Sequence, residues 1–206
     1  MKQILDTAKG TPMYMAILLD LSTGLRRGEL LALQWSDIDL DCGFINVHRQ
    51  LLPSVKKTSG YSTYIVDTLK THNSTRQVGI PLKVIEELKL HQAQQELDKQ
   101  ELGEAYQDKD INFDLVIRQS NGKHYHPRDF AKKFDKILKD SGVEKRKIHD
   151  MRHTYATHLL TNGAYVNEVQ MSLGHSDAKT TLQNYAHILP GRQKEIANRM
   201  NNILPI

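Results

Sequence analysis

The hydrophobic pattern of this chain changes period twice, and this limits the fold more than any other feature. Over residues 12–33 the apolar residues recur near helical spacing, with an interruption at Gly24, which predicts two helices. Over residues 43–81 the pattern turns to β-branched and aromatic runs, FINVHRQLL, STYIVDTL and TRQVGI, separated by turn-forming residues. Helical patterns then return. The sequence therefore predicts a mostly helical α+β fold with a small three-stranded antiparallel sheet near its N-terminus.

The C-terminal two thirds of the chain should be largely helical. We expect a long polar helix over residues 82–103, a short strand over 115–118, and an amphipathic helix over 127–139. A further helix should begin near Lys147 or Ile148. Three glycines fall where helix ends are expected, at positions 142, 163 and 174.

Length and composition are those of one ordinary globular domain. A chain of 206 residues can bury one good core, so we expect a single domain over residues 1–206. No apolar run approaches the roughly 20 residues of a membrane helix. The single cysteine, Cys42, excludes an internal disulfide and a cysteine-cluster zinc site, and a reducing cytoplasm is the expected location.

Charge is distributed unevenly, although the formal net charge is only +4. Residues 86–114 hold nine acidic and three basic side chains, whereas residues 123–152 hold ten basic and five acidic ones. Such a field favours an oriented polyanion such as nucleic acid, and Lys132 and Lys133 are candidate DNA contacts. The alternative is that these lysines, with Lys136 and Lys139, only solvate one face of a helix.

The segment LSTGLRRGELLALQWSDID, residues 21–39, holds the first candidate site residues. Arg26 and Arg27 lie at the start of a predicted helix, where cations are uncommon because the helix dipole favours anions there. Together with free backbone N–H groups they could bind phosphate. Glu29 lies three residues after Arg26 and could hold its guanidinium. Alternatively, both arginines are surface residues paired with Glu29.

Lys70 ends the run STYIVDTL and lies beside a tight turn in LKTHNSTR. A lysine at a hairpin tip is ordinarily just solvated. An ammonium held close to a phosphate could instead protonate a departing alkoxide, so Lys70 is a candidate general acid only in company with other phosphate-binding residues.

The segment IHDMRHTYATHLL, residues 148–160, holds the second candidate cluster. His149 and Arg152 are three positions apart and share one helix face. His149 and His153 also have the i, i+4 spacing of a zinc-binding helix, but no glutamate takes the position of the base in a HExxH peptidase. Because Arg152 would also repel a cation, we expect no metal here.

The segment SLGHSDAKTTLQNYAH, residues 172–187, holds the last pair of candidates. Gly174 is a predicted helix stop, and Ser176 or Asp177 would cap a following helix. Ten residues separate His175 from Tyr185, so one short helix could bring the two side chains to one site. Taken singly, Tyr185 would be a partly buried aromatic residue and His175 a capping residue.

Together, these four segments resemble the catalytic domain of the tyrosine recombinases, the integrase family of phages and conjugative elements of bacteria. The family pattern is an arginine in TGLR, a lysine in the β-hairpin, HxxR, then LGH and a tyrosine about ten residues later. The resemblance extends over about residues 11–199, and 82–122 carry no motif of their own. The matching positions are Arg26, Lys70, His149, Arg152, His175 and Tyr185.

The resemblance implies a mechanism that needs neither a metal, a cofactor nor ATP. Tyr185 would attack a DNA phosphate and form a 3′-phosphotyrosine, with Arg26, Arg152 and His175 neutralising the phosphate charge. His149 would be the base and Lys70 the general acid. The alternatives are a type IB topoisomerase, a non-catalytic DNA-binding regulator of the same fold, and a metal-dependent hydrolase.

The resemblance also implies partners. Double-stranded DNA with a recombination site would be the substrate, bound by a homotetramer that is monomeric without DNA, with accessory DNA-bending proteins and no membrane contact. Family members carry DNA-binding segments ahead of the catalytic domain, and we expect none in this chain. Residues 186–206 would be a C-terminal segment that exchanges contacts between neighbouring protomers.

Overall fold

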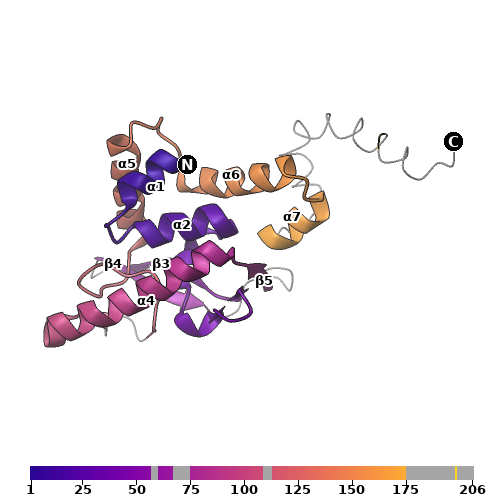
Figure 1. Ribbon diagram of the computed structural model, residues 1–206. Helices are drawn as coiled ribbons and strands as arrows, with labels where there is room; N and C mark the ends of the chain where they lie inside the picture. Colours follow the sequence, from indigo (N-terminus) through magenta and orange to yellow (C-terminus); the bar gives the residue numbers. More distant parts are fainter. Residues whose placement is uncertain (57–59, 67–74, 109–112, 175–197, 199–206) are drawn as a thin grey trace.

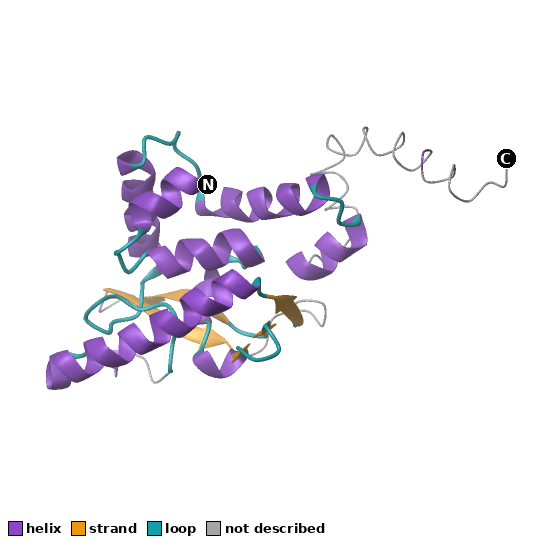
Figure 2. Cartoon of the chain, in the orientation of Figure 1, coloured by secondary structure: helices purple, strands orange, loops and turns teal. Residues whose placement is uncertain are grey.

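The computed structural model describes residues 1–56, 60–66, 75–108, 113–174 and 198 (Figure 1). Helices dominate these residues, which confirms the predicted fold class (Figure 2). The order of elements is α1 Lys2–Ala8, α2 Tyr14–Thr23, α3 Arg27–Ala32, the 3-10 helix η1 Trp35–Asp37, β1 Ile38–Asp39, β2 Phe44–Val47, β3 Gln50–Lys56, β4 Gly60–Val66, β5 Arg76–Gly79, α4 Leu82–Leu102, the 3-10 helix η3 Gly103–Ala105, α5 Pro127–Asp140, α6 Ile148–Thr161 and α7 Val166–Leu173.

The strands form two small antiparallel sheets. In the three-stranded sheet β2 pairs with β1 and β5, with Ile45 opposite Val78, and β3 and β4 form a separate hairpin. The run FINVHRQLL, predicted as one strand, is therefore broken between β2 and β3. The break falls at His48 and Arg49, whose side chains turn towards the buried carboxylate of Asp37, at 3.6 Å and 3.3 Å. This contact lies where the chain passes from the first sheet into the second.

Two further differences from the sequence prediction concern short segments. Residues 115–118 form isolated bridges, Leu115 with Gln34 and Arg118 with His124, instead of a strand. The guanidinium of the buried Arg118 donates to the carbonyls of Gly122, at 2.6 Å, and Phe113, so side-chain bonds stabilise this turn. The short helix α1, which the hydrophobic pattern had not predicted, packs against α2 and α5.

The hydrophobic core is centred on α2. This helix lies between α6 and α4 (Figure 1) and buries Ile17 and Leu19 almost completely. Each such side chain contributes about 1.5–3 kcal/mol to the stability of the fold. The fully buried residues of α4 lie in its first two turns, whereas most of its remainder is exposed. None of the helices in the described ranges combines the length and apolar character that crossing a bilayer requires.

Helices α6 and α7 bring distant segments together. A small cluster of Ala156, Leu160, Val169 and Leu173 holds α7 against α6. After α6 the chain turns back, so that α7 runs towards β5 (Figure 1) and contacts it. The C-terminal end of α7 consequently lies beside the start of α3.

Candidate active site

Arg26 links the start of α3 to the end of α7. Its Nη1 lies 2.7 Å from Glu29 Oε1, and its Nη2 donates to the carbonyl oxygen of Gly174 at 2.9 Å. The other carboxylate oxygen of Glu29 accepts the Arg26 backbone N–H at 2.8 Å and so caps the helix. The contact that the i, i+3 spacing predicts is therefore present.

Arg76, the first residue of β5, completes a buried network around Glu29. Its Nη1 and Nη2 donate to the two carboxylate oxygens at 3.1 Å and 2.9 Å, and its Nε donates to the carbonyl of Ser172 in α7 at 2.7 Å. Only 6% of the Arg76 side chain and 2% of the Glu29 side chain are exposed. Burial alone would raise the pKa of Glu29, but the hydrogen bonds and charges of Arg76 and Arg26 outweigh it and lower that pKa.

Arg152 reaches the same place from α6. It is almost fully buried, and its Nη1 donates to the carbonyl oxygen of Gly24 at 2.6 Å while its Nη2 donates to that of Leu173. Arg26 binds the next carbonyl along, at Gly174. Two guanidinium groups that are far apart in sequence therefore meet at the C-terminal end of α7, immediately before residue 175.

Two glycines allow this close approach. Gly24 has a φ of +61°, and a Cβ there would lie 2.4 Å from the ring of Tyr155. Gly174 has a φ of +64°, and a Cβ there would lie 2.9 Å from Cδ of Arg76. Tyr155 is itself fixed by a hydrogen bond of 2.7 Å between its hydroxyl and Ser172 Oγ. Both positions thus require glycine for conformation and for space.

His149 lies in the first turn of α6, close enough to both arginines for their charges to act on it. Partial removal of its ring from water lowers its pKa, and the neighbouring His153, Arg152 and Arg26 lower it further. The rings of His149 and His153 meet edge to face at 4.9 Å. Within the described residues no group of three or more side chains has the arrangement of a metal site. Because its pKa is lowered, His149 favours the neutral form, which can accept a proton.

Several predicted site residues lie outside this arrangement. Lys70, His175 and Tyr185 are outside the described residues, as are the C-terminal residues 186–206 apart from 198. Lys132 and Lys133 lie on α5, and they contact residues outside this arrangement. Lys132 pairs with Asp129 at 3.2 Å, and Lys133 lies over the ring of Tyr125, with its Nζ 5.2 Å from the ring centroid.

Sequence reasoning missed Arg76 and Asp20. Arg76 gives no local signal, because its partners lie 47 and 96 residues away in the chain. Asp20 did offer a local signal, since it is a carboxylate within the apolar run Ile17–Leu21 of a helix. It is buried beside Arg152, and its Oδ1 has no hydrogen-bond partner among the described residues. Burial raises its pKa well above the usual value, against the opposing charge of Arg152.

The raised pKa of Asp20 predicts a pH-dependent cost in stability. Below the ordinary aspartate pKa of about 4 the carboxyl is neutral in both the folded and the unfolded protein. As the pH rises towards the folded-state pKa, only the unfolded chain ionises, which costs about 1.4 kcal/mol per pH unit. Above pH 4, Asp20→Asn should therefore gain stability relative to wild type as the pH rises, which urea unfolding measures. A difference that stays constant with pH would contradict this.

Comparison with known proteins gives a consistent result. The profile of the phage integrase family matches residues 1–192. An XerC-like tyrosine recombinase of Caldanaerobacter subterraneus subsp. tengcongensis is 34% identical over 206 residues, covering 98% of this chain and 52% of the relative. The ICEBs1 integrase of Bacillus subtilis is 34% identical over 182 residues, covering 88% of this chain and 46% of the relative. The chain thus spans about half the length of these relatives.

Solved structures share the fold. The Tn1549 transposon integrase in complex with transposon right end DNA has a TM-score of 0.76 at 25% identity, covering 97% of this chain and 64% of that one. The XerA recombinase has a TM-score of 0.68 at 23% identity, covering 97% of this chain and 62% of that one. On its sequence and its fold, this chain belongs to the phage integrase family of tyrosine recombinases.

Proposed function

We propose that this chain is the catalytic domain of a site-specific DNA recombinase that breaks and rejoins strands through a 3′-phosphotyrosine on Tyr185. The observation that carries the proposal is the convergence of Arg26 and Arg152 on consecutive carbonyls, of Gly174 and Leu173, at the end of α7. The related integrases and recombinases support the same activity, and the Tn1549 integrase complex supports DNA as the partner.

The arginine pair supplies the electrostatic part of the reaction. When a phenol oxygen attacks a phosphodiester, negative charge develops on the two nonbridging oxygens. A guanidinium is a planar, permanently charged fork that can donate two hydrogen bonds to such oxygens. Arg26 and Arg152, held by carbonyl contacts on one side, would stabilise that charge in the transition state, with His175 as a further donor.

Proton transfers would complete the strand cleavage. A tyrosine hydroxyl has an ordinary pKa of about 10, so Tyr185 needs a base or a cationic surrounding at neutral pH. His149, with its lowered pKa, is the candidate acceptor of the phenol proton. The bond from Tyr185 to phosphorus forms as the bond to the 5′ oxygen breaks, and Lys70 would protonate that oxygen.

Rejoining would follow without ATP, because the phosphotyrosyl ester keeps the energy of the broken phosphodiester. Attack by a 5′ hydroxyl from a partner duplex exchanges strands and releases Tyr185. We propose a homotetramer that holds two duplexes, with residues 186–206 contacting a neighbouring protomer and with DNA-bending proteins as accessories. The setting would be the bacterial cytoplasm, during movement of a phage or other mobile element.

A nicked DNA duplex with the cognate recombination site tests this function. After cleavage the short 3′ strand diffuses away, so rejoining stops and a covalent protein–DNA adduct accumulates. We expect a shifted band on denaturing electrophoresis for the wild type and none for Tyr185→Phe, which should still bind the duplex. No adduct with the wild-type protein would contradict the proposal. Relaxation of supercoiled DNA without any recombinant product would favour the type IB topoisomerase alternative.

A further inference from the structure

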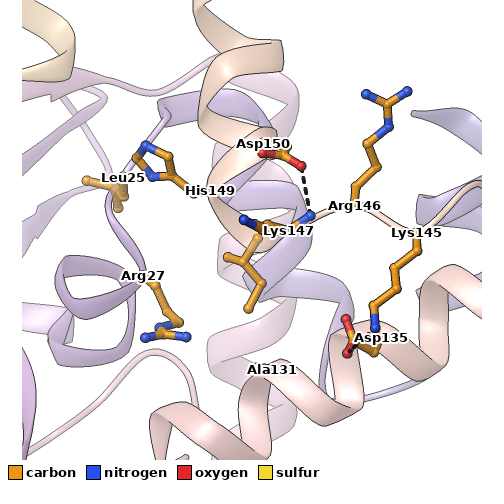
Figure 3. A pocket seen from close by; sticks show the side chains of 10 residues that line it. Leu25, Arg27, Ala131, Asp135, Lys145, Arg146, Lys147, His149 and Asp150 are labelled. Atoms are coloured by element: carbon orange, nitrogen blue, oxygen red, sulfur yellow. Dashed lines mark hydrogen bonds and ion pairs between the residues drawn. The ribbon is translucent and has the colours of Figure 1, made fainter.

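A pocket of about 720 Å³ opens directly beside His149 (Figure 3). Three segments form it: Leu25 and Arg27 at the start of α3, the α5 face that carries Ala131 and Asp135, and residues 145–150. Its size lies within the range of roughly 300–1,000 Å³ that is usual for ligand sites. His149 therefore belongs both to the candidate active site and to the lining of this pocket.

The charges around the pocket are mostly positive and partly uncompensated. The two acidic side chains that line it are already engaged: Asp150 accepts the Lys147 backbone N–H at 2.8 Å, and Asp135 lies 4.0 Å from Lys145. Arg146 lies 3.3 Å from Glu144 and points away from the pocket (Figure 3).

Arg27 and Lys147 are the cations left without such a partner. Both side chains are exposed, and within the described ranges neither forms an ion pair with a carboxylate. They approach the pocket from different elements, Arg27 from the start of α3 and Lys147 from the residue before α6. An anion bound between them would have cations on two sides and the neutral His149 at its edge.

We propose that this pocket binds the DNA backbone next to the scissile phosphate, with Arg27 and Lys147 neutralising the adjoining phosphates. The inference rests on the proposed function, which brings a DNA strand to His149. Successive phosphates of one strand rise by only about 3.4 Å along the duplex axis, so a strand held at His149 must pass its neighbouring phosphates close by. Leu25 and Ile148 are buried and form the apolar floor of the pocket beneath these cations.

The residues that line the pocket differ from the DNA contacts predicted from sequence. Lys132 and Lys133 belong to the same basic region, but Lys132 pairs with Asp129 and Lys133 lies over Tyr125, outside the pocket lining. Arg27 and Lys147, by contrast, both line the pocket, as His149 does. We therefore assign the contacts nearest the reaction to Arg27 and Lys147.

Salt-dependent binding of a labelled, mixed-sequence DNA duplex tests the assignment, because phosphate contacts do not depend on base sequence. Each neutralised phosphate contributes about 0.9 to the slope of log affinity against log salt. Arg27→Ala and Lys147→Ala should each lower that slope by about one, and the double variant by about two, with an affinity loss of about tenfold at moderate salt. Arg27→Glu should lower the affinity further.

Lys89→Ala is the matched control, since it removes one exposed lysine from α4, outside the pocket. Equal slopes for the two pocket variants, this control and the wild type would overturn the proposal. The measurement involves no strand cleavage, so it reports whether the pocket contacts phosphates even if Tyr185 forms no adduct. Conversely, an adduct with unchanged slopes would leave the proposed function standing and remove only the pocket's role. Thermal unfolding of each variant verifies that the fold is kept.

Discussion

Arg76→Ala is expected to lower the free energy of unfolding by about 3–5 kcal/mol and to abolish strand cleavage, although Arg76 touches no reacting atom in the proposed mechanism. Removing one partner of a buried ion pair leaves the other charge uncompensated, which accounts for a loss of this size. Here that charge is on Glu29, whose side chain is 2% exposed and which would keep only the 38% exposed Arg26 as a charged partner.

The loss of cleavage should exceed what instability alone explains. Arg76 joins β5 to Glu29 and to the Ser172 carbonyl, so it positions both Arg26 and the chain that leads to His175. Arg76→Lys keeps the positive charge but cannot span the carboxylate and the carbonyl together. We expect Arg76→Lys to stay folded at 25 °C and bind DNA while forming covalent adducts slowly. Wild-type adduct rates in the folded Arg76→Lys protein would show that Arg76 acts on stability alone.

Arg152→Ala and Arg26→Ala should also have large effects on strand cleavage. Each should reduce adduct formation by about 10²–10³-fold or more, because a preorganised donor to a developing oxyanion is lost. Their effects on stability should differ. Arg152 is buried and satisfies the carbonyl oxygens of Gly24 and Leu173, so its loss should cost about 1–3 kcal/mol per orphaned group.

The side chain of Arg26, by contrast, is 38% exposed, and Glu29 keeps Arg76 when Arg26 is removed. Arg26→Ala should therefore unfold close to the wild-type denaturant concentration while losing the same catalytic factor. Urea unfolding and single-turnover adduct formation separate the two effects. Equal destabilisation of both variants would contradict the burial argument.

The parts of the site that sequence could predict are local. The contact between Arg26 and Glu29 follows from a three-residue spacing at a helix start, and His149 and Arg152 share a helix face for the same reason. The convergence of Arg26 with Arg152 was implied by family resemblance, not by spacing. Their shared position depends on α7 folding back along α6, which no local pattern encodes.

The parts that sequence missed depend on distant partners. Arg76 begins a strand and would be taken for an ordinary surface residue, yet its bonds to Glu29 cross 47 residues. The break between β2 and β3 coincides with contacts from His48 and Arg49 to Asp37, a buried carboxylate that precedes both strands. Buried polar contacts of this kind override the strand pattern of the segment itself.

Neutralising the phosphate chemically tests the central claim, that two guanidinium groups share one scissile phosphate. In a nicked duplex whose scissile phosphate carries a methyl group in place of one nonbridging oxygen, one negative charge is gone, and with it the need for one arginine. Adduct formation by Arg152→Ala, and in parallel by Arg26→Ala, should be low on the ordinary substrate and substantially restored on the methylphosphonate, whereas Tyr185→Phe should stay inactive on both. Arginine variants that are equally inactive on the two substrates would contradict the account.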